Sequence, residues 1–277
     1  MTQNPAGFQP HVGSIPTSGT NYFLKLRLLQ TLIIFVCQLF LQFCYALPNE
    51  EIQRYQSFLV DKPIGDRIAF WAEKFVGIPY DMDPLGEYVS KATLVADERV
   101  DCMYMTFRAV ELALSNTPEE ATQIALEKRF RSKGILQDGK VMNYEDRFEY
   151  GEDMIWSGKW GKDVTSQVGK TLKIKNVKRK DSMDILSSEI LLRGLEKLRS
   201  GDIIFFINDA LQREKGEIVG HIGIIKVEQN LKGSGGREVY IIHASGTKEK
   251  GGEVKKVLLK DYISKMPFIG AKITRFH

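Results

Sequence analysis

The chain has 277 residues, of which 43% are hydrophobic and 27% are charged, and its net charge is +4. This length and composition provide enough apolar side chains for one well-packed core and argue against intrinsic disorder. Because the 39 basic residues are nearly balanced by 35 acidic ones, the sequence lacks the basic footprint of a nucleic-acid-binding protein.

The first 46 residues form a distinct leader. They contain no Asp or Glu, and Lys25 and Arg27 precede a largely apolar run that continues to Ala46. A basic region, an apolar region and a small residue at the end are typical of a secretory signal peptide. We therefore predict that residues 1–46 direct export to the periplasm or the cell exterior. An uncleaved N-terminal anchor is the alternative, and membrane association is expected only through residues 23–46.

Export changes what is expected of the three cysteines. Cys37 and Cys44 lie in the leader, so cleavage would leave Cys102 as the single thiol of the mature chain. One thiol cannot form a disulfide within its own molecule, and in an oxidising compartment it is a liability unless it is buried or used. Cys102 is therefore a candidate chemical reagent.

Helical patterns dominate the first half of the mature chain. From Asp61 the apolar residues recur at spacings of three and four, which predicts a helix that ends near Gly77. Residues 81–100 are expected to be irregular. Asp101 is a candidate N-cap for a second helix, which places Cys102 in its first turn. A third helix is predicted from Pro118, capped by Thr117, to about Arg131.

The second half of the chain is predicted to consist mainly of strands. Residues 135–165 have no clear period, whereas residues 170–180 alternate as a strand with a basic outer face. Five further strands are predicted, at residues 203–207, 219–227, 239–243, 254–259 and 268–274. Helices followed by antiparallel strands predict an α+β fold, with the N-terminal helices packed on the C-terminal sheet. We expect residues 47–277 to form a single domain with a middle insertion around 132–180.

Two of the four histidines lie on neighbouring predicted strands. In a hairpin centred at Lys232, His221 pairs directly with His243, and directly opposed residues point to the same face of a sheet. A one-residue slip of the loop centre would leave the two side chains diagonal but still on that face. Either register brings two imidazoles together in a chain with one mature cysteine.

These three side chains can carry nucleophilic chemistry. A helix N-terminus favours the thiolate, and its free N–H groups can stabilise an oxyanion. One imidazole would accept the thiol proton and the other would fix its orientation. A zinc site formed by Cys102, His221 and His243 is the weaker alternative, because their spacing resembles no zinc-binding motif. We expect neither a metal nor a cofactor.

Five short motifs also resemble a known family. In chain order they are Gly77–Tyr80, Asp101-Cys102, Gly201–Ile204, Gly220–Ile224 and Ile242–Ser245. They are similar to motifs of the NlpC-like cell-wall peptidases, which are papain-fold cysteine hydrolases with a Cys-His-His triad. The segment from Asp138 to Ile155 resembles the N-acetylmuramoyl-L-alanine amidase-like branch. The resemblance covers nearly all of residues 64–276.

The resemblance implies a role for each candidate residue. Cys102 would be the nucleophile, His221 the base and His243 the residue that orients it. Tyr80 would contact the substrate or its oxyanion, or else serve as a core aromatic. Arg147 and Tyr150 would flank the cleft and contact the sugar of the substrate, or else their segment would only pack on the helices.

The substrate implied by the resemblance is peptidoglycan or a muropeptide. The bond cut would be the amide between the sugar lactyl group and L-Ala, or a D-γ-glutamyl–diamino acid bond of the stem peptide. Two other functions stay open at this point. One is a non-catalytic wall-binding module of the same fold, and the other is an acyltransferase.

Overall fold

The computed structural model describes residues 47–177, 180–209, 211, 217–229 and 236–277. Residues Tyr45–His277 form one compact unit. The predicted leader, residues 1–46, and the tip of the predicted hairpin, residues 230–235, lie outside the described residues. Within the described part of the chain, no helix is long and apolar enough to cross a membrane.

The helices are mostly short. They are α2 (Asn49–Leu59), α3 (Ile64–Lys74), α4 (Glu87–Ser90), α5 (Cys102–Leu114), α6 (Pro118–Lys128), the 3₁₀ turn η1 (Tyr144–Asp146), α7 (Gly151–Ser157), α8 (Thr165–Val168), α9 (Ser188–Arg193), the 3₁₀ turn η2 (Leu195–Lys197) and α10 (Leu259–Lys265). The longest, α5, carries the candidate nucleophile at its first position.

The strands form one large antiparallel sheet and one small hairpin. They are β1 (Leu136–Gln137), β2 (Lys140–Val141), β3 (Lys162–Asp163), β4 (Leu172–Val177), β5 (Lys180–Ser187), β6 (Ile203–Ile207), β7 (Val219–Gln229), β8 (Arg237–Thr247), β9 (Gly251–Leu258) and β10 (Gly270–Arg275). The large sheet has the order β4-β5-β10-β6-β7-β8-β9, with β3 added to β10, and β1 pairs with β2. The fold is therefore mixed α+β with an antiparallel sheet, as predicted.

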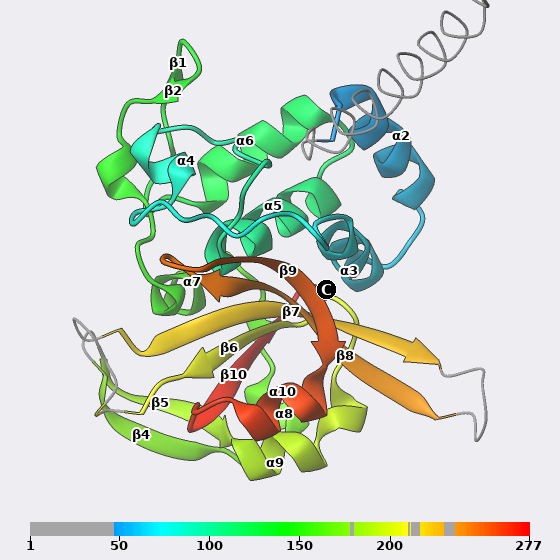
Figure 1. Cartoon of the computed structure of the whole chain (residues 1–277), viewed down its shortest axis with the longest axis vertical. Coiled ribbons are helices and arrows are strands. Elements are labelled where there is room, and N and C mark those ends of the chain that lie inside the picture. The colour runs from blue at the N-terminus through cyan, green and yellow to red at the C-terminus, as the bar shows by residue number, and fades with distance from the viewer. Residues whose placement is uncertain (1–46, 178–179, 210, 212–216, 230–235) are drawn as a thin grey trace, which may run out of the picture. The chain divides into compact units, whose positions relative to one another are not determined.

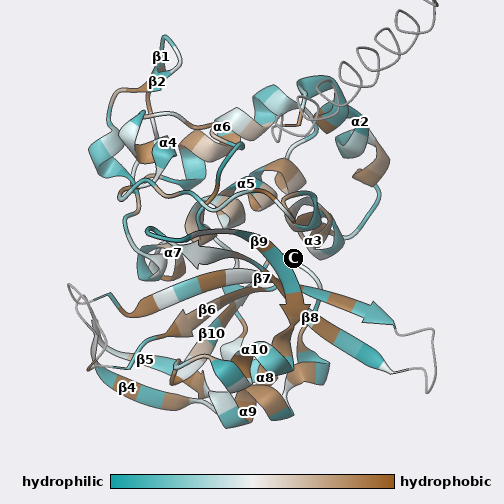
Figure 2. Cartoon of the chain, in the orientation of Figure 1, coloured by the Kyte–Doolittle hydropathy of each residue, from teal (hydrophilic) through white to brown (hydrophobic). Residues whose placement is uncertain are grey.

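Helices cover both faces of this sheet. The helices α3 and α5 lie on one side, and α8, α9 and α10 lie on the other (Figure 1). The central strand β6 is buried along its whole length and appears as a hydrophobic band in Figure 2. Its alternate residues enter two separate cores, because Phe205 packs with the α5 side and Phe206 with the α10 side. The prediction of helices on the sheet describes only the first of these two layers.

The predicted helix starts are confirmed where a capping residue marks them. The carboxylate of Asp101 accepts a hydrogen bond from the backbone N–H of Tyr104 at 2.7 Å. The hydroxyl of Thr117 accepts one from the N–H of Glu120 at 3.1 Å. The helix predicted from Asp61 begins only after Pro63 and ends at Lys74, because a proline fixes φ and suits the first turn of a helix rather than its interior.

Some elements differ from the prediction. The predicted strand at residues 254–259 ends at Leu258, and Leu259 begins α10. Leu259, Tyr262 and Ile263 are buried at helical spacing, so burial against the sheet selects a helix. The predicted strand at residues 170–180 is β4, and its partner β5 was not predicted. The helices α2 and α4 were also not predicted, and both are short.

Candidate active site

Cys102 occupies the first position of α5, at the point where this helix meets β7 and β8. Its side chain is half-buried. Burial, and to a smaller extent the nearby carboxylate of Asp101, raise the pKa of the thiol to about 12. The backbone N–H groups of Ile222 and of Cys102 itself hydrogen-bond to the sulfur and act in the opposite direction. The resting thiol is therefore protonated at neutral pH.

The two candidate histidines are hydrogen-bonded to each other. Nε2 of His221 lies 2.8 Å from Nδ1 of His243, and the two rings are nearly perpendicular at 88°. This bond leaves Nδ1 of His221 as the nitrogen that can accept a proton from a thiol. Among the described residues no hydrogen bond joins the sulfur of Cys102 to either imidazole. Catalytic hydrogen bonds are often long before substrate binds.

The predicted direct pairing of His221 with His243 is wrong, and the alternative register, with the loop centre shifted by one residue, is the one observed. The observed ladder pairs Ile224 with Ile242 and Ile225 with Ile241. Continued by one residue, this register places Gly223 opposite His243, so the two histidines are diagonal and on the same face. Because Gly223 has no side chain, nothing at that position separates the two imidazoles.

The strands β7 and β8 separate at the histidines. Their ladder begins at Ile224↔Ile242, whereas β8 stays paired with β9 as far as Thr247. His221 pairs with Phe206 on β6, which places its imidazole on the α10 face of the sheet. Cys102 approaches from the α5 face and meets the N–H of Ile222 at this end of β7. The thiol and the imidazoles therefore come from opposite faces of one sheet.

Aromatic rings enclose the imidazoles on the α10 face. The ring centroid of Tyr262 lies 4.7 Å from that of His243 and 6.0 Å from that of His221. Phe206 and Phe268 stack on His221 at 6.4 and 6.5 Å. Burial, and then the interaction with the neighbouring imidazole of His243, lower the pKa of His221 to about 3. Burial and then Lys255 lower the pKa of His243 to about 4.

Tyr80 lies beside Cys102. Its backbone N–H donates to the carbonyl oxygen of Gly252 at 2.8 Å, which ties the segment after α3 to β9. Its ring lies against Gly246 so closely that a Cβ at this glycine would come within 2.8 Å of Cγ. Burial raises the pKa of the Tyr80 hydroxyl, and the proximity of Cys102 and Asp101 raises it further. The structure thus brings Tyr80 to the nucleophile.

Arg147 and Tyr150 are placed differently. The guanidinium of Arg147 donates to the carbonyl oxygen of Tyr144 at 3.4 Å and lies 3.7 Å from the carboxylate of Glu149. Arg147 therefore contacts its neighbours in the chain and not the cysteine or the histidines. Tyr150 stands directly before α7, and its backbone N–H donates to the carboxylate of Asp153 at 3.2 Å.

The middle segment is nevertheless fixed close to the histidine strand. The carboxylate of Glu152 on α7 accepts hydrogen bonds from the N–H groups of Ile218 and Val219, at 3.4 and 3.3 Å. Gly151 packs so tightly on β7 that an added Cβ would lie 2.6 Å from Cγ1 of Val219. The start of α7 is thus attached to β7 two residues before His221.

The sequence prediction missed Tyr262, Phe206 and Phe268 around the imidazoles. The sequence contains a pattern that could have identified Tyr262, because residues 259, 262 and 263 have the spacing of a buried helix face. No local pattern relates Phe268 to His221, because the two residues meet only when β6 lies between β7 and β10.

The sequence left a zinc site at Cys102, His221 and His243 as an alternative. Throughout the described part of the chain, no group of three or more His, Cys, Asp or Glu side chains is arranged to hold a metal ion. The arrangement of the described residues therefore gives no support to the zinc alternative for Cys102, His221 and His243.

Comparisons with known proteins show where this fold occurs. No protein-family model matches the sequence, and no curated protein does. A crystal structure of a Legionella pneumophila protein of the DUF1460 family is similar at 18% identity and a TM-score of 0.61, covering 81% of this chain and 93% of that one. An N-acetylmuramoyl-L-alanine amidase from Bacteroides uniformis is similar at 19% identity and a TM-score of 0.57, covering 76% of this chain and 98% of that one.

A third structure carries a different name. It comes from Bacteroides fragilis, was provisionally described as a xylanase, and is 20% identical with a TM-score of 0.55. The comparison covers 75% of this chain and all of the other. At such identities the likeness establishes the fold, and the function must be argued from the site.

Proposed function

We propose that this protein is a cysteine hydrolase with a papain-like, NlpC-type fold that cuts an amide bond of peptidoglycan. The observation that carries the proposal is the 2.8 Å hydrogen bond between His221 and His243 next to a cysteine at a helix N-terminus. A base held by a second group beside a nucleophile is the arrangement that covalent catalysis requires. The similarity in fold to a bacterial N-acetylmuramoyl-L-alanine amidase supports the choice of substrate.

The hydrogen bond determines the tautomers that the reaction needs. If Nδ1 of His221 accepts the proton of the Cys102 thiol, Nε2 of His221 must carry a hydrogen and donate it to Nδ1 of His243. His243 then carries its own hydrogen on Nε2. Proton transfer makes His221 an imidazolium, and the lone pair of His243 stabilises this charge. His221 later returns the proton to the leaving amine.

The resting protonation states suit this sequence of events. Burial keeps the thiol protonated and both imidazoles neutral. The proton would therefore move from sulfur to nitrogen during attack on the carbonyl carbon, and no thiolate–imidazolium pair would exist beforehand. The N–H groups of Ile222 and Cys102, which already hydrogen-bond to the sulfur, are donors for the charge that develops on the sulfur and on the substrate oxygen.

The amide between the lactyl group of the sugar and L-Ala is our choice of scissile bond. The start of α7 is fixed against β7 two residues before His221, so the middle segment borders the α5 face of this end of β7, the face from which the thiol of Cys102 approaches. A sugar-bearing substrate needs an additional contact surface of this kind, whereas a bare stem peptide does not. Tyr150, directly before α7, is the residue we assign to this border.

Purified muropeptides with N-acetylmuramic acid attached provide the test. Incubation with the protein should release the free sugar and a peptide that begins with L-Ala, both identified by mass spectrometry. Recovery of L-Ala–D-Glu still joined to the sugar would instead assign the cut to the stem peptide. No cleavage by the wild-type protein, with Cys102→Ala as the blank, would contradict the hydrolase proposal and favour a wall-binding module.

Peptidoglycan lies outside the cytoplasm, so the proposal also requires export. We assign this role to residues 1–46, which have the charge and apolar pattern of a signal peptide. Expression in a secreting host should yield a chain that begins near Leu47, as read by N-terminal sequencing. A full-length chain in the cytoplasmic fraction would argue against this assignment.

A further inference from the structure

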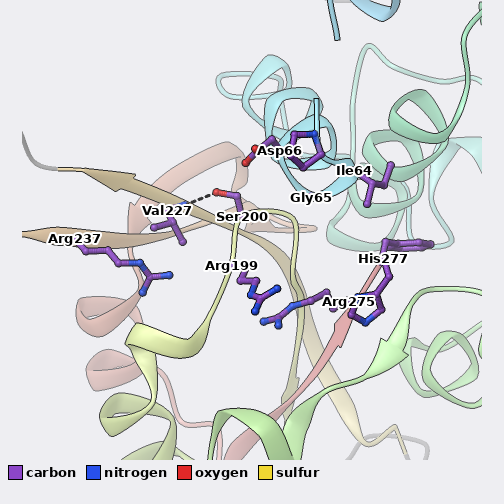
Figure 3. A pocket seen from close by; sticks show the side chains of 11 residues that line it. Ile64, Gly65, Asp66, Arg199, Ser200, Val227, Arg237, Arg275 and His277 are labelled. Atoms are coloured by element: carbon purple, nitrogen blue, oxygen red, sulfur yellow. Dashed lines mark hydrogen bonds between the residues drawn. The ribbon is translucent and has the colours of Figure 1, made fainter. Parts of the chain in front are cut away.

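A cavity of about 620 Å³, shown in Figure 3, is lined by neither His221 nor His243. It is bordered by the first turn of α3, by Arg199 and Ser200 before β6, and by the ends of β7 and β10. Val227, its contribution from β7, is six residues beyond His221, which corresponds to about 20 Å along a strand. None of Cys102, His221 and His243 lines it, so any ligand here would be distinct from the substrate at the thiol.

Three arginines from three different elements line this cavity, and their guanidinium groups point toward a common space (Figure 3). Arg275 on β10 is 7% exposed, and its Nε and Nη2 lie 2.6 and 2.7 Å from the carboxylate oxygens of Asp202. Arg237 on β8 donates from Nη1 to the carbonyl oxygen of Leu195 at 2.9 Å. These bonds hold two of the three guanidinium groups in place before any ligand binds.

Arg199 differs from the other two arginines of the cavity. Its side chain is exposed, and it makes no hydrogen bond or ion pair with any of the described residues. Among the residues that line the cavity, the side chains carry three positive charges and one negative charge, that of Asp66. Asp202 behind the wall neutralises Arg275. Arg199 is therefore the cation of this cavity that stands at space a ligand can enter without any side-chain partner among the described residues.

The helix α3 adds backbone donors to the same space. Its N-terminal neighbour Pro63 has no side chain that can cap the helix, and no side-chain cap is present. Among the described residues, no acceptor pairs with the N–H groups of Gly65 and Asp66, which are in the first turn and line the cavity. Unpaired N–H groups at the start of a helix favour an anion.

We propose that this cavity binds a phosphate group. Guanidinium groups recognise phosphate through paired N–H donors, and a tetrahedral dianion has enough oxygens to engage several of them together with backbone N–H groups. The group could belong to inorganic phosphate or to a phosphodiester polymer, and the chemistry of recognition is the same for both. The proposal is independent of the hydrolase function, because it involves none of the residues of the candidate active site.

The test compares phosphate binding by the full chain and by two variants, using calorimetry and thermal unfolding at matched ionic strength. Phosphate should raise the unfolding temperature of the wild-type protein, because a ligand that binds only the native state stabilises it. Arg199→Ala should weaken phosphate binding about 10-fold or more, the effect of losing one charge-assisted hydrogen bond. Arg54→Ala, an exposed arginine on α2, removes the same charge elsewhere and should leave binding unchanged.

A second arm identifies the source of the phosphate. Inorganic phosphate and a glycerol phosphate oligomer are titrated separately, and tighter binding of either one, weakened by Arg199→Ala, supports the site and names its ligand. Chloride at equal ionic strength controls for screening. The proposal is overturned if neither phosphate compound binds, or if Arg199→Ala binds both as tightly as the wild-type protein.

Discussion

The two faces of the central sheet contribute differently to the candidate active site. The α5 face is covered by the longer helices and supplies the thiol of Cys102 from the first turn of α5. The α10 face is covered by short helices and supplies both imidazoles among aromatic rings. The groups meet because β7 and β8 separate beyond Ile224↔Ile242. Substitutions on one face can therefore change the nucleophile without disturbing the packing around the base.

The largest effect is expected on the α5 face. Cys102→Ala should lower muropeptide turnover by about 10³-fold or more, because the nucleophile and its base act as a unit. The unfolding temperature should change little, since the side chain is small and only half-buried. Turnover is measured by chromatography of the released peptide, and unfolding by circular dichroism. Retention of most wild-type activity would rule out the proposed mechanism.

On the α10 face the two histidines should differ from each other. His221→Ala removes the base and should cost about as much as Cys102→Ala. His243→Ala leaves the base present but without its partner, and should cost about 10- to 100-fold by analogy with other orienting groups. Both are measured as kcat/KM on the same substrate. Equal losses in the two variants would show that His243 does more than orient His221.

The pH dependence of Cys102 alkylation distinguishes whether burial or the base His221 determines how much thiolate is present. Because burial raises the pKa of Cys102 to about 12, its thiolate fraction should increase about tenfold for each pH unit between pH 7 and pH 10. The rate of alkylation by iodoacetamide should follow this increase without a plateau. His221→Ala should leave the profile unchanged, because the imidazole is already neutral in this range. A plateau below pH 7 would instead indicate a preformed thiolate–imidazolium pair.

The smallest effect is expected from a single hydroxyl on the α10 face. The hydroxyl of Tyr262 has no hydrogen-bond partner among the described residues. Burial raises the pKa of this hydroxyl, and the nearby Cys102 is a second cause of the increase. Tyr262→Phe keeps the ring against His243 and should lower kcat about 2- to 10-fold, the effect of one neutral hydrogen bond to substrate. Tyr240→Phe on β8, whose hydroxyl pairs with Glu238, is the matched control. Equal rates for all three proteins would exclude a role for the Tyr262 hydroxyl.

The same contrast explains how far the sequence could predict the structure. On the α5 face, Asp101 and Thr117 mark helix starts through local chemistry, and both helices begin as predicted. The strand pattern also brought His221 and His243 to one face, because both directly opposed and diagonal residues of an antiparallel pair point to the same face of the sheet. These features depend on neighbours in the chain.

Other features depend on contacts between distant segments. The register of β7 and β8 is shifted from the predicted one, because the pairing is determined over the whole ladder up to Gln229↔Arg237. The packing of Phe268 on His221 requires the strand order β10-β6-β7, which no local pattern encodes. The guanidinium of Arg147 lies beside Tyr144 and Glu149, and its role at the cleft stays a prediction.

The separation of β7 from β8 also has a consequence for observing the reaction. The N–H of Ile222 hydrogen-bonds to the sulfur of Cys102, where a regular ladder would offer it a carbonyl oxygen. Acylation of that sulfur would change this hydrogen bond of the Ile222 amide. The chemical state of the cysteine should therefore be visible in the amide resonance of Ile222 in a nuclear magnetic resonance spectrum and in the deuterium exchange rate of this amide. No probe needs to be attached to the cysteine itself.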